Sequence, residues 1–384
     1  MKRLAIVTTH PVQYYAPVFR LLQERARILP TVFYTTGSHN ETYDPGFNRH
    51  IKWDIPLLDG YRYELVENIA KDPGSHHFKG AINPGLIAAI DASEPDAVLV
   101  IGWSYASHLK VMRHYHHVRP VYFRGDSTLL DTCSSLRQLF RPVMLRWIYR
   151  HVDHAFYNGT HNRAYFKKYG LKDRQLSFAP HAIDNERFGA DHSAEAEQLR
   201  RDLGIAADEI LVLFSGKFES KKAPLFLLEN FLKIDLEKVH LAFTGSGTLE
   251  PALRKMAMGK QNIHFLPFQN QSVMPVVYQS CDLYCLPSSG PAETWGLAVN
   301  EAMASGKAVL VSDKVGCEAD LVLPDNGAIF QSGNSEAFCS ALARLTVSRK
   351  NLAALGTHSK NIIQPWNFEN IAIAIENQLL HEKN

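Results

Sequence analysis

The sequence predicts an α/β protein with two doubly wound parallel-sheet domains that face each other across a cleft. Three observations lead to this prediction. The chain has 384 residues, which is long for one domain. Short apolar runs alternate with helix-length segments, as in parallel sheets covered by helices on both faces. The alternation stops in a polar, Ala-rich stretch at residues 185–209 and restarts after it.

The apolar runs are the expected strands. The first set lies at residues 4–9, 29–34, 97–101, 121–123, 154–157 and 176–179. The second set lies at residues 210–214, 239–243, 263–266, 283–285, 308–311 and 327–330. A hinge at 180–192 divides the chain into predicted domains at 1–185 and 186–364. The remaining segment, 365–384, has helical apolar spacing and is expected to pack back on the first domain.

Composition excludes several classes of protein. Hydrophobic residues make up 46% of the chain and charged residues 21%, which are ordinary values for a globular protein and exclude disordered or fibrous chains. The net charge is only +2, but residues 101–180 hold thirteen Lys and Arg against four acids. This imbalance predicts a face turned toward anions. Nucleic acid is not an expected partner, because no recognisable binding module accompanies the charge.

Cysteine usage and the amino terminus indicate the compartment. The five cysteines have no paired or metal-binding spacing, so Cys281 and Cys285 in particular are expected to be buried free thiols. The opening is basic and then apolar, but the apolar run stops at His10, which is too short for a signal peptide. With no apolar segment of 18 residues, the expected location is cytoplasmic.

Residues 135–151 carry four arginines among aliphatic and aromatic side chains, with Pro142 inside the stretch. Two interpretations remain open. A basic, aromatic-rich helix could rest on an anionic membrane surface. The same pattern also fits an amphipathic core helix with an exposed basic face.

Two carboxylates, Glu293 and Glu301, stand eight residues apart around the start of an expected helix. Glu293 lies in a Pro/Ser/Gly loop that follows an apolar strand, and Glu301 lies inside the helix. So placed, they could hold two sets of hydroxyls on one extended, sugar-rich ligand. An acid/base pair of the glycoside-hydrolase kind is the other interpretation. The helix amino terminus between them favours the first, since it offers backbone N–H groups to an anion.

Two further loops follow strands of the second domain. Lys217 and Lys222 come after a strand that ends at Gly216, and compact ammonium groups there suit a diphosphate. A solvated lysine cluster is the plain alternative. Gly245 and Gly247 end the next strand and would let a phosphate approach the backbone, although an ordinary strand-to-helix turn has the same pattern.

In this order and spacing, the motifs resemble the retaining glycosyltransferases of family four, which have the GT-B fold of two Rossmann-like domains. The resemblance covers nearly all of residues 205–315 and is most specific over the Glu-x7-Glu block. It implies that Glu293 binds the donor sugar, that Glu301 binds the ribose, and that Lys217 and Lys222 bind the diphosphate. The other donor-binding residues that it implies are Gly216, Gly245, Gly247, Thr294, Trp295, Gly296, Leu297 and Ala298.

The chain departs from the family pattern at several positions. Lys217 stands where Arg is usual, which keeps the charge but loses the bidentate fork. Trp295 stands where Phe is commoner. The segment 180–188 resembles the family's crossover between domains, and we expect His181 within it to be structural rather than catalytic.

The first domain matches the family less well. His10, Gln13 and Tyr14 replace the usual Gly-rich loop and are candidates for contact with the acceptor or the donor phosphate, although His10 could equally cap the loop. Arg124 and Asp126 lie where the family commonly has a His. Asp126 could accept a hydrogen bond from the acceptor hydroxyl, and Arg124 could hold Asp126 or a phosphate. An internal salt bridge without a catalytic part is an equal alternative.

The resemblance implies retaining transfer of a sugar from a nucleotide diphosphate sugar to an acceptor hydroxyl, without a metal cofactor. Lys217, Lys222, Glu293 and Asp126 are the candidate catalytic residues. The basic first domain suggests an anionic acceptor, such as a lipid-linked saccharide in bacterial surface polysaccharide synthesis (O-antigen, capsule or lipopolysaccharide), with peripheral membrane contact at the cytoplasmic face.

The alternatives are a GT-B sugar-nucleotide epimerase or hydrolase, and a non-catalytic sugar-nucleotide-binding subunit. A nicotinamide dehydrogenase is disfavoured, because neither domain's first strand leads into Gly-x-Gly-x-x-Gly.

Overall fold

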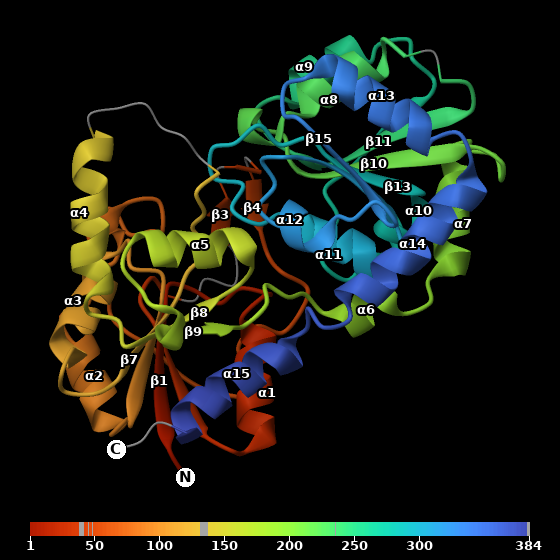
Figure 1. The fold of residues 1–384 in the computed structure, drawn as a ribbon. Helices are drawn as coiled ribbons and strands as arrows, with labels where there is room; N and C mark the ends of the chain where they lie inside the picture. Colours follow the sequence, from red (N-terminus) through yellow and green to blue (C-terminus); the bar gives the residue numbers. More distant parts are fainter. Residues whose placement is uncertain (38–41, 45, 48, 131–136, 235, 382–384) are drawn as a thin grey trace. The chain divides into compact units, whose positions relative to one another are not determined.

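The computed structural model describes the chain except for residues 38–41, 45, 48, 131–136, 235 and 382–384. The chain forms two compact units (Figure 1). Unit 1 comprises Met1–Asn40, Pro56–His181 and Asn367–Asn384, and unit 2 comprises Glu41–Ile55 and Ala182–Trp366. Each unit contains one parallel sheet with helices around it, so the predicted fold class is confirmed.

Unit 1 is built on a seven-stranded sheet in the order β5-β2-β1-β6-β7-β8-β9, and all its strand pairs are parallel. Its strands are β1 (Arg3–Thr8), β2 (Leu29–Tyr34), β5 (Arg62–Leu65), β6 (Ala97–Ile101), β7 (Val121–Arg124), β8 (His154–Tyr157) and β9 (Leu176–Phe178). Its helices are α1 (Ala16–Arg25), η1 (Phe78–Gly80), α2 (Leu86–Ala92), α3 (Ala106–Tyr115), α4 (Arg137–Tyr149), α5 (Thr160–Lys168), η2 (Asp173–Gln175) and α15 (Phe368–His381).

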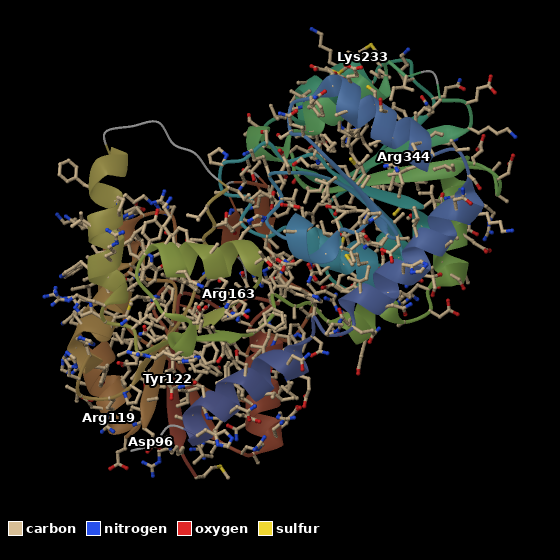
Figure 2. All side chains as sticks on the ribbon, viewed as in Figure 1. Asp96, Arg119, Tyr122, Arg163, Lys233 and Arg344 are labelled. Carbon is tan, nitrogen blue, oxygen red and sulfur yellow. The ribbon has the colours of Figure 1, made fainter. Side chains whose placement is uncertain are left out.

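The strands of unit 1 follow the apolar runs of the sequence, with one exception. In β1, β6 and β7 most side chains are buried, and Tyr122 of β7 is fully buried. Figure 2 marks Tyr122 within the sheet and Arg163 on α5. The exception is β5, an edge strand whose four side chains are all exposed. An exposed edge strand needs no apolar pattern, which is why the sequence did not predict it.

The carboxyl-terminal helix α15 packs on α1. The Arg25 guanidinium donates from Nε and Nη2 to the Glu376 carboxylate at 2.8 and 2.9 Å, and the Glu376 side chain is fully buried. Lys2 Nζ donates to the Leu379 carbonyl at 2.8 Å. A buried charge pair fixes this helix in one register, since breaking it would leave an uncompensated carboxylate in the core.

Unit 2 is built on a six-stranded parallel sheet in the order β12-β11-β10-β13-β14-β15. Its strands are β10 (Ile210–Lys217), β11 (Val239–Ser246), β12 (Ile263–Leu266), β13 (Leu283–Leu286), β14 (Ala308–Ser312) and β15 (Gly327–Phe330). Its helices are α6 (Asn185–Gly189), α7 (Ser193–Asp202), η3 (Ser220–Lys222), α8 (Pro224–Phe231), α9 (Glu250–Met256), α10 (Met274–Ser280), α11 (Leu297–Ala304), α12 (Glu318–Leu321), α13 (Ser335–Leu345) and α14 (Arg349–Ile363).

Unit 2 also contains a segment from the first part of the chain. Glu41–Ile55 forms the short antiparallel pair β3 (Thr42–Asp44) and β4 (Arg49–Ile51). Ser246 Oγ donates to the Phe47 carbonyl at 2.8 Å, and Asn270 Nδ2 donates to the Lys52 carbonyl at 2.6 Å. The predicted boundaries at 185/186 and 364/365 did not include this excursion, because a short polar hairpin has no pattern that assigns it to a distant domain.

The strand order of each sheet reverses direction at one point. This switch lies between β1 and β6 in unit 1 and between β10 and β13 in unit 2. In open α/β sheets, ligands bind beyond the carboxyl ends of the strands at such switch points. The fold therefore directs attention to the loops after β10 and β13 and, in unit 1, to those after β1, β6 and β7.

Candidate functional site

The loop after β10 folds back so that the Lys222 side chain lies beside the end of β10. Gly216 has a φ of +143°. A Cβ on Gly216 would lie 3.9 Å from Lys222 Cε, so the lysine side chain crosses beside the glycine backbone. Pro224 opens α8 directly after this loop, where a missing N–H removes no helical bond.

Glu293 meets Lys222 at the switch point. Lys222 Nζ lies 2.7 Å from Glu293 Oε2, and Ser288 Oγ donates to the same oxygen at 2.9 Å. Both charged side chains are largely buried, with 17% and 8% of their surfaces exposed. Ser312 Oγ in turn donates to the Ser288 carbonyl. The structure thus places two of the predicted donor-site residues in direct contact, and it adds Ser288, which belongs to the motif but was given no role.

Helix α11 begins with an uncapped amino terminus. Gly296 is its N-cap residue, with a φ of +95° and no side-chain cap. A Cβ there would come within 2.7 Å of Val315 Cγ1, so only glycine fits. The first backbone N–H groups of a helix have no carbonyl partner within it. Leu297 and Ala298 occupy these first positions and are suited to bind an anion.

The turn before α11 is held against residues 316 and 317. Gly316 N donates to the Glu293 carbonyl at 3.1 Å, and Cys317 N donates to the Trp295 carbonyl at 2.9 Å. A Cβ on Gly316 would come within 1.9 Å of the Thr294 carbonyl oxygen. This close backbone contact fixes the loop that carries Glu293.

Glu301 is placed by two buried hydroxyls. Tyr278 OH donates to Glu301 Oε2 at 2.8 Å and lies 2.6 Å from Ser215 Oγ. Burial, and after it the Glu301 charge, raises the pKa of Tyr278 far above its ordinary value. The phenol therefore stays protonated and is the hydrogen-bond donor to Glu301. Ser215 lies one residue before Gly216, the glycine that Lys222 passes. The hydroxyls that position Glu301 are therefore attached to the same strand end as the Lys222 loop.

Lys217 lies beside the excursion rather than beside Glu293. Its Nζ is 5.2 Å from the centroid of the Phe47 ring, and that ring contacts Phe268 edge to face at 5.2 Å. A Cβ on Gly46 would come within 2.4 Å of Lys217 Cδ. A cation over an aromatic face is attracted by the ring quadrupole. Sequence reasoning missed Phe47, because nothing in the pattern connects residue 47 with the second domain.

The two glycines at the end of β11, Gly245 within the strand and Gly247 directly after it, have a packing role. A Cβ on Gly245 would come within 2.0 Å of the Gly216 carbonyl oxygen, and one on Gly247 within 2.7 Å of Phe218 N. The ends of β10 and β11 therefore approach more closely than side chains would allow. The expectation that these glycines also admit a phosphate stays a prediction.

The unit 1 candidates lie at the carboxyl edge of its sheet. His10, Gln13 and Tyr14 are half-buried in the loop between β1 and α1, and Asp126 is exposed after β7. Strand β6 alone separates β1 from β7, so the two loops share one end of the sheet. Their acceptor-side roles stay predictions.

Arg124 is bound to the backbone of the crossover segment. Its side chain is buried and donates from Nη1 to the Ala179 carbonyl at 2.8 Å and from Nη2 to the Pro180 carbonyl at 2.7 Å. The guanidinium also lies 5.8 Å from the Tyr15 ring centroid. Burial, with the nearby Arg124 charge, lowers the pKa of His181 to about 3, so this histidine is neutral. These contacts give Arg124 an architectural role.

Two hollows of unit 2, of about 370 and 530 Å³, lie at the amino-terminal ends of β10, β13 and β14, opposite to the ends that carry the candidate site. Arg200 and Arg349 there both bind the Asp282 carboxylate, at 2.9 and 2.7 Å. These two arginines stabilise the fold through Asp282. The hollows are separate from the candidate site.

Cys281, Cys285 and Cys317 are buried free thiols, and burial raises the pKa of each. The prediction of buried free thiols is confirmed for these three, Cys339 is a free thiol that is only half-buried, and Cys133 lies outside the described residues. Among the described residues, no helix is both long and apolar enough to cross a membrane.

The fold and this site define a class: a GT-B protein with charged and hydroxyl side chains at the switch point of its second sheet. Residues 195–362 match the family model described as glycosyl transferases group 1. The chain is 30% identical over 361 residues to the D-inositol 3-phosphate glycosyltransferase of Geodermatophilus obscurus, an alignment covering 90% of this chain and 66% of that protein. The chain is therefore similar to glycosyltransferases of this group.

Two solved structures share the fold. HepE of Anabaena in complex with UDP and glucose has a TM-score of 0.72 at 17% identity, with both chains covered completely. Sucrose-phosphate synthase of Thermosynechococcus elongatus has a TM-score of 0.75 at 17% identity, with coverage of 99% of this chain and 98% of that one.

The chain spans less than two thirds of the length of the curated relatives it matches. It covers 66% of the Geodermatophilus protein and 49% of the D-inositol 3-phosphate glycosyltransferase of Rhodococcus erythropolis.

Proposed function

We propose that this protein transfers a sugar, with retention of configuration, from a nucleotide diphosphate sugar to an acceptor hydroxyl. Glu293 binds the donor sugar and Glu301 the ribose. Lys222 and Lys217, with the amides of Leu297 and Ala298, hold the diphosphate. The observation that carries the proposal is the 2.7 Å Lys222–Glu293 contact at the switch point between β10 and β13.

The chemistry follows from the charges at this point. An ammonium group fixed by Glu293 lies ready to neutralise the negative charge that develops on the leaving diphosphate. The amino terminus of α11 adds backbone donors for the same charge. These groups take the place of a divalent cation, so the proposed transfer is metal-independent. The acceptor attacks from the face that the diphosphate leaves, and a phosphate oxygen takes its proton.

The donor half is tested by thermal stability with nucleotide diphosphates and their sugars in a chelator. One nucleotide diphosphate should raise Tm without metal, and UDP is the first to try, because HepE was solved with UDP. Glu301→Ala should abolish that shift. A strict metal requirement would contradict the metal-independent mechanism. Turnover of the nucleotide sugar at a rate independent of any acceptor would favour the epimerase or hydrolase instead.

We further propose that the acceptor is a lipid-linked saccharide at an anionic membrane surface, as in surface polysaccharide synthesis. Helix α4 supports this choice. Phe140, Val143, Met144 and Trp147 recur at helical spacing and are exposed by 75%, 67%, 44% and 36%. Arg141 and Arg146 are exposed on the same helix, and Arg150 is exposed directly after its last residue. An apolar stripe bordered by arginines is complementary to an anionic bilayer surface.

Vesicle co-sedimentation tests this surface. The protein should bind vesicles containing anionic lipid but not neutral vesicles, and Phe140→Ser with Trp147→Ser should abolish binding. Val347→Ser, at an equally exposed apolar residue of unit 2 (78%), should leave it unchanged. Equal binding of the double variant would remove α4 from the proposal.

A further inference from the structure

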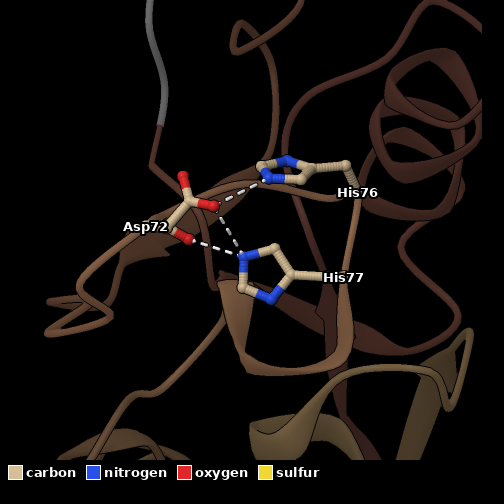
Figure 3. Close-up of side chains that lie close together, drawn as sticks. All are labelled: Asp72, His76 and His77. Carbon is tan, nitrogen blue, oxygen red and sulfur yellow. Dashed lines mark hydrogen bonds and ion pairs between the residues drawn. The ribbon is translucent and has the colours of Figure 1, made fainter.

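A loop of unit 1 brings two imidazoles and a carboxylate together. Asp72, His76 and His77 lie between β5 and η1, and their candidate ligand atoms are all within 4.8 Å of one another. Within the part of the chain that the structure describes, this is the only group of three such residues that meets that spacing. Figure 3 shows the two rings directed at the Asp72 carboxylate.

The spacing matches that of metal ligands. Asp72 Oδ2 lies 3.1 Å from His76 Nε2 and 3.2 Å from His77 Nε2. Around a tetrahedral Zn²⁺, with bonds of about 2.0–2.1 Å, neighbouring ligand atoms are about 3.3 Å apart. His77 Nε2 also lies 2.9 Å from the Asp72 carbonyl oxygen, which is a candidate fourth ligand. Small rotations of the side chains would therefore admit a cation.

The backbone of the loop is held in place by contacts outside the cluster. Gly74 N donates to the Gly80 carbonyl at 3.1 Å, and a Cβ on Gly80 would come within 2.0 Å of the Gly74 carbonyl oxygen. Tyr105 OH donates to the Ser75 carbonyl at 3.1 Å. These bonds hold the backbone at residues 74, 75 and 80, and an ion would add the constraint on Asp72 and on the two histidine side chains.

The ion pairs of His76 and His77 with Asp72 do not by themselves explain why the three side chains lie together. The side chains of Asp72, His76 and His77 are 71%, 60% and 35% exposed. Ion pairs this exposed contribute little to stability. Such a contribution is small against the entropy of ordering three side chains in an exposed loop. A divalent cation would use all three groups at once, since imidazole and carboxylate are ordinary zinc ligands.

We propose that Asp72, His76 and His77 bind one divalent transition-metal ion of the zinc type. The ion ties residues 72–77 into a closed loop beside Tyr105, the N-cap residue of α3 after β6. Its role is to order this part of the carboxyl edge of the unit 1 sheet. It is separate from the donor site, whose residues all belong to unit 2.

Calorimetric titration tests the site on the full chain without a histidine tag, after treatment with a chelator. Zn²⁺ should bind saturably with one equivalent. Asp72→Asn and His76→Asn should each weaken the affinity at least about tenfold, the usual loss even for residues that only support a ligand. His114→Asn, at another exposed histidine of unit 1, should keep the wild-type affinity. Unchanged affinity in both ligand variants would show an adventitious ion elsewhere and overturn the proposal.

Proteolysis supplies a readout of the loop itself. Lys71 is exposed directly before Asp72, so trypsin should cleave after it. Zn²⁺ should slow this cut in the wild type and in His114→Asn but not in His76→Asn. Cleavage after exposed Lys350 of unit 2 serves as the internal standard. Equal cleavage after Lys71 with and without Zn²⁺ would overturn the loop-closing role.

Discussion

The carboxyl edges of the two sheets are built differently. In unit 2, an ion pair, several hydroxyls and an uncapped helix surround the switch point, and close backbone approaches that only glycine permits support them. In unit 1, the corresponding edge carries aromatic rings, an arginine bound to backbone carbonyls and buried neutral histidines. The first edge has charge available for a ligand, whereas the second uses its main cation, Arg124, for folding.

This difference agrees with the division of work between the units in the proposed function. A nucleotide diphosphate needs fixed cations and backbone donors, and these must be mounted rigidly to act on developing charge. At the corresponding edge of unit 1, the proposed acceptor-side groups are the exposed Asp126 and the half-buried loop after β1. These would need only to position an acceptor hydroxyl. Each of the following predictions tests this contrast, beginning with the largest effect.

Acid should unfold unit 1 before unit 2. Burial lowers the pKa of His108 and of His154 to about 4, and that of His181 to about 3. Unfolded histidine has a pKa of about 6.5, so the stabilising contribution is complete above that pH and is lost as the pH falls toward 4. Each of the three histidines accounts for about 2 kcal/mol, so unit 1 should lose roughly 6 kcal/mol between pH 7.5 and 5.

Hydrogen exchange, corrected for the intrinsic rate at each pH, measures this loss. Peptides from β6 and β7 should lose protection at a higher pH than peptides from β10 and β11. His108→Gln should reduce the pH dependence, because glutamine has no group that takes up a proton in this range. Its amide can replace the neutral ring in the hydrogen bonds to Thr35 Oγ1 and the Gly102 carbonyl. Earlier loss of protection in unit 2 would contradict the contrast.

Lys222→Ala should lower kcat for sugar transfer by about 10²–10³, the usual effect of removing one group that stabilises developing charge. Lys221→Ala is the matched control. That neighbour is more exposed, pairs with Glu219 at 3.3 Å and should change kcat less than about twofold. Steady-state kinetics with the donor identified by thermal shift makes the comparison. Similar losses in both variants would mean a diffuse lysine cluster and no dedicated phosphate ligand.

Gly245→Ala should destabilise unit 2 by about 3 kcal/mol or more, because its φ is +134° and the new Cβ would collide with the Gly216 carbonyl. Gly204→Ala has a positive φ of +73° but open space, so it should cost only about 1–2 kcal/mol. Urea unfolding of both variants separates collision from backbone strain. Equal losses would show that the ends of β10 and β11 can separate freely.

Tyr278→Phe should have the smallest effect. It removes the hydroxyl that joins Ser215 to Glu301, at a cost of about 1 kcal/mol in the free energy of unfolding. Nucleotide affinity should fall less than about tenfold, because the Glu301 carboxylate remains. Tyr284→Phe loses only a 3.4 Å contact with the Ser215 carbonyl and should be nearly neutral. A complete loss of nucleotide binding in Tyr278→Phe would make the tyrosine, and not Glu301, the principal ligand.

Most of the two sheets was readable from the sequence. The expected strands at 29–34, 97–101 and 263–266 have the same bounds in the structure. Each of them buries part or most of its side chains in a parallel sheet, so each is a short apolar run in the sequence. The edge strand β5 and the hairpin β3–β4 were not predicted, since exposed or short polar strands lack that signal. The motif likewise gave roles to Glu293 and Lys222 but none to Ser288, because a serine is common in loops and its sequence position does not show which oxygen it contacts.

The sequence by itself determined the fold class, the order of the strands along the chain and the residue types available for a donor site. These depend on local periodicity and on short motifs, which are properties of neighbouring residues. Only the tertiary structure decided that Lys222 pairs with Glu293, that Lys217 lies against Phe47 and that Arg124 binds the crossover backbone. Those contacts join residues distant in the chain, and the side chain that a charge meets is set by packing and burial in three dimensions.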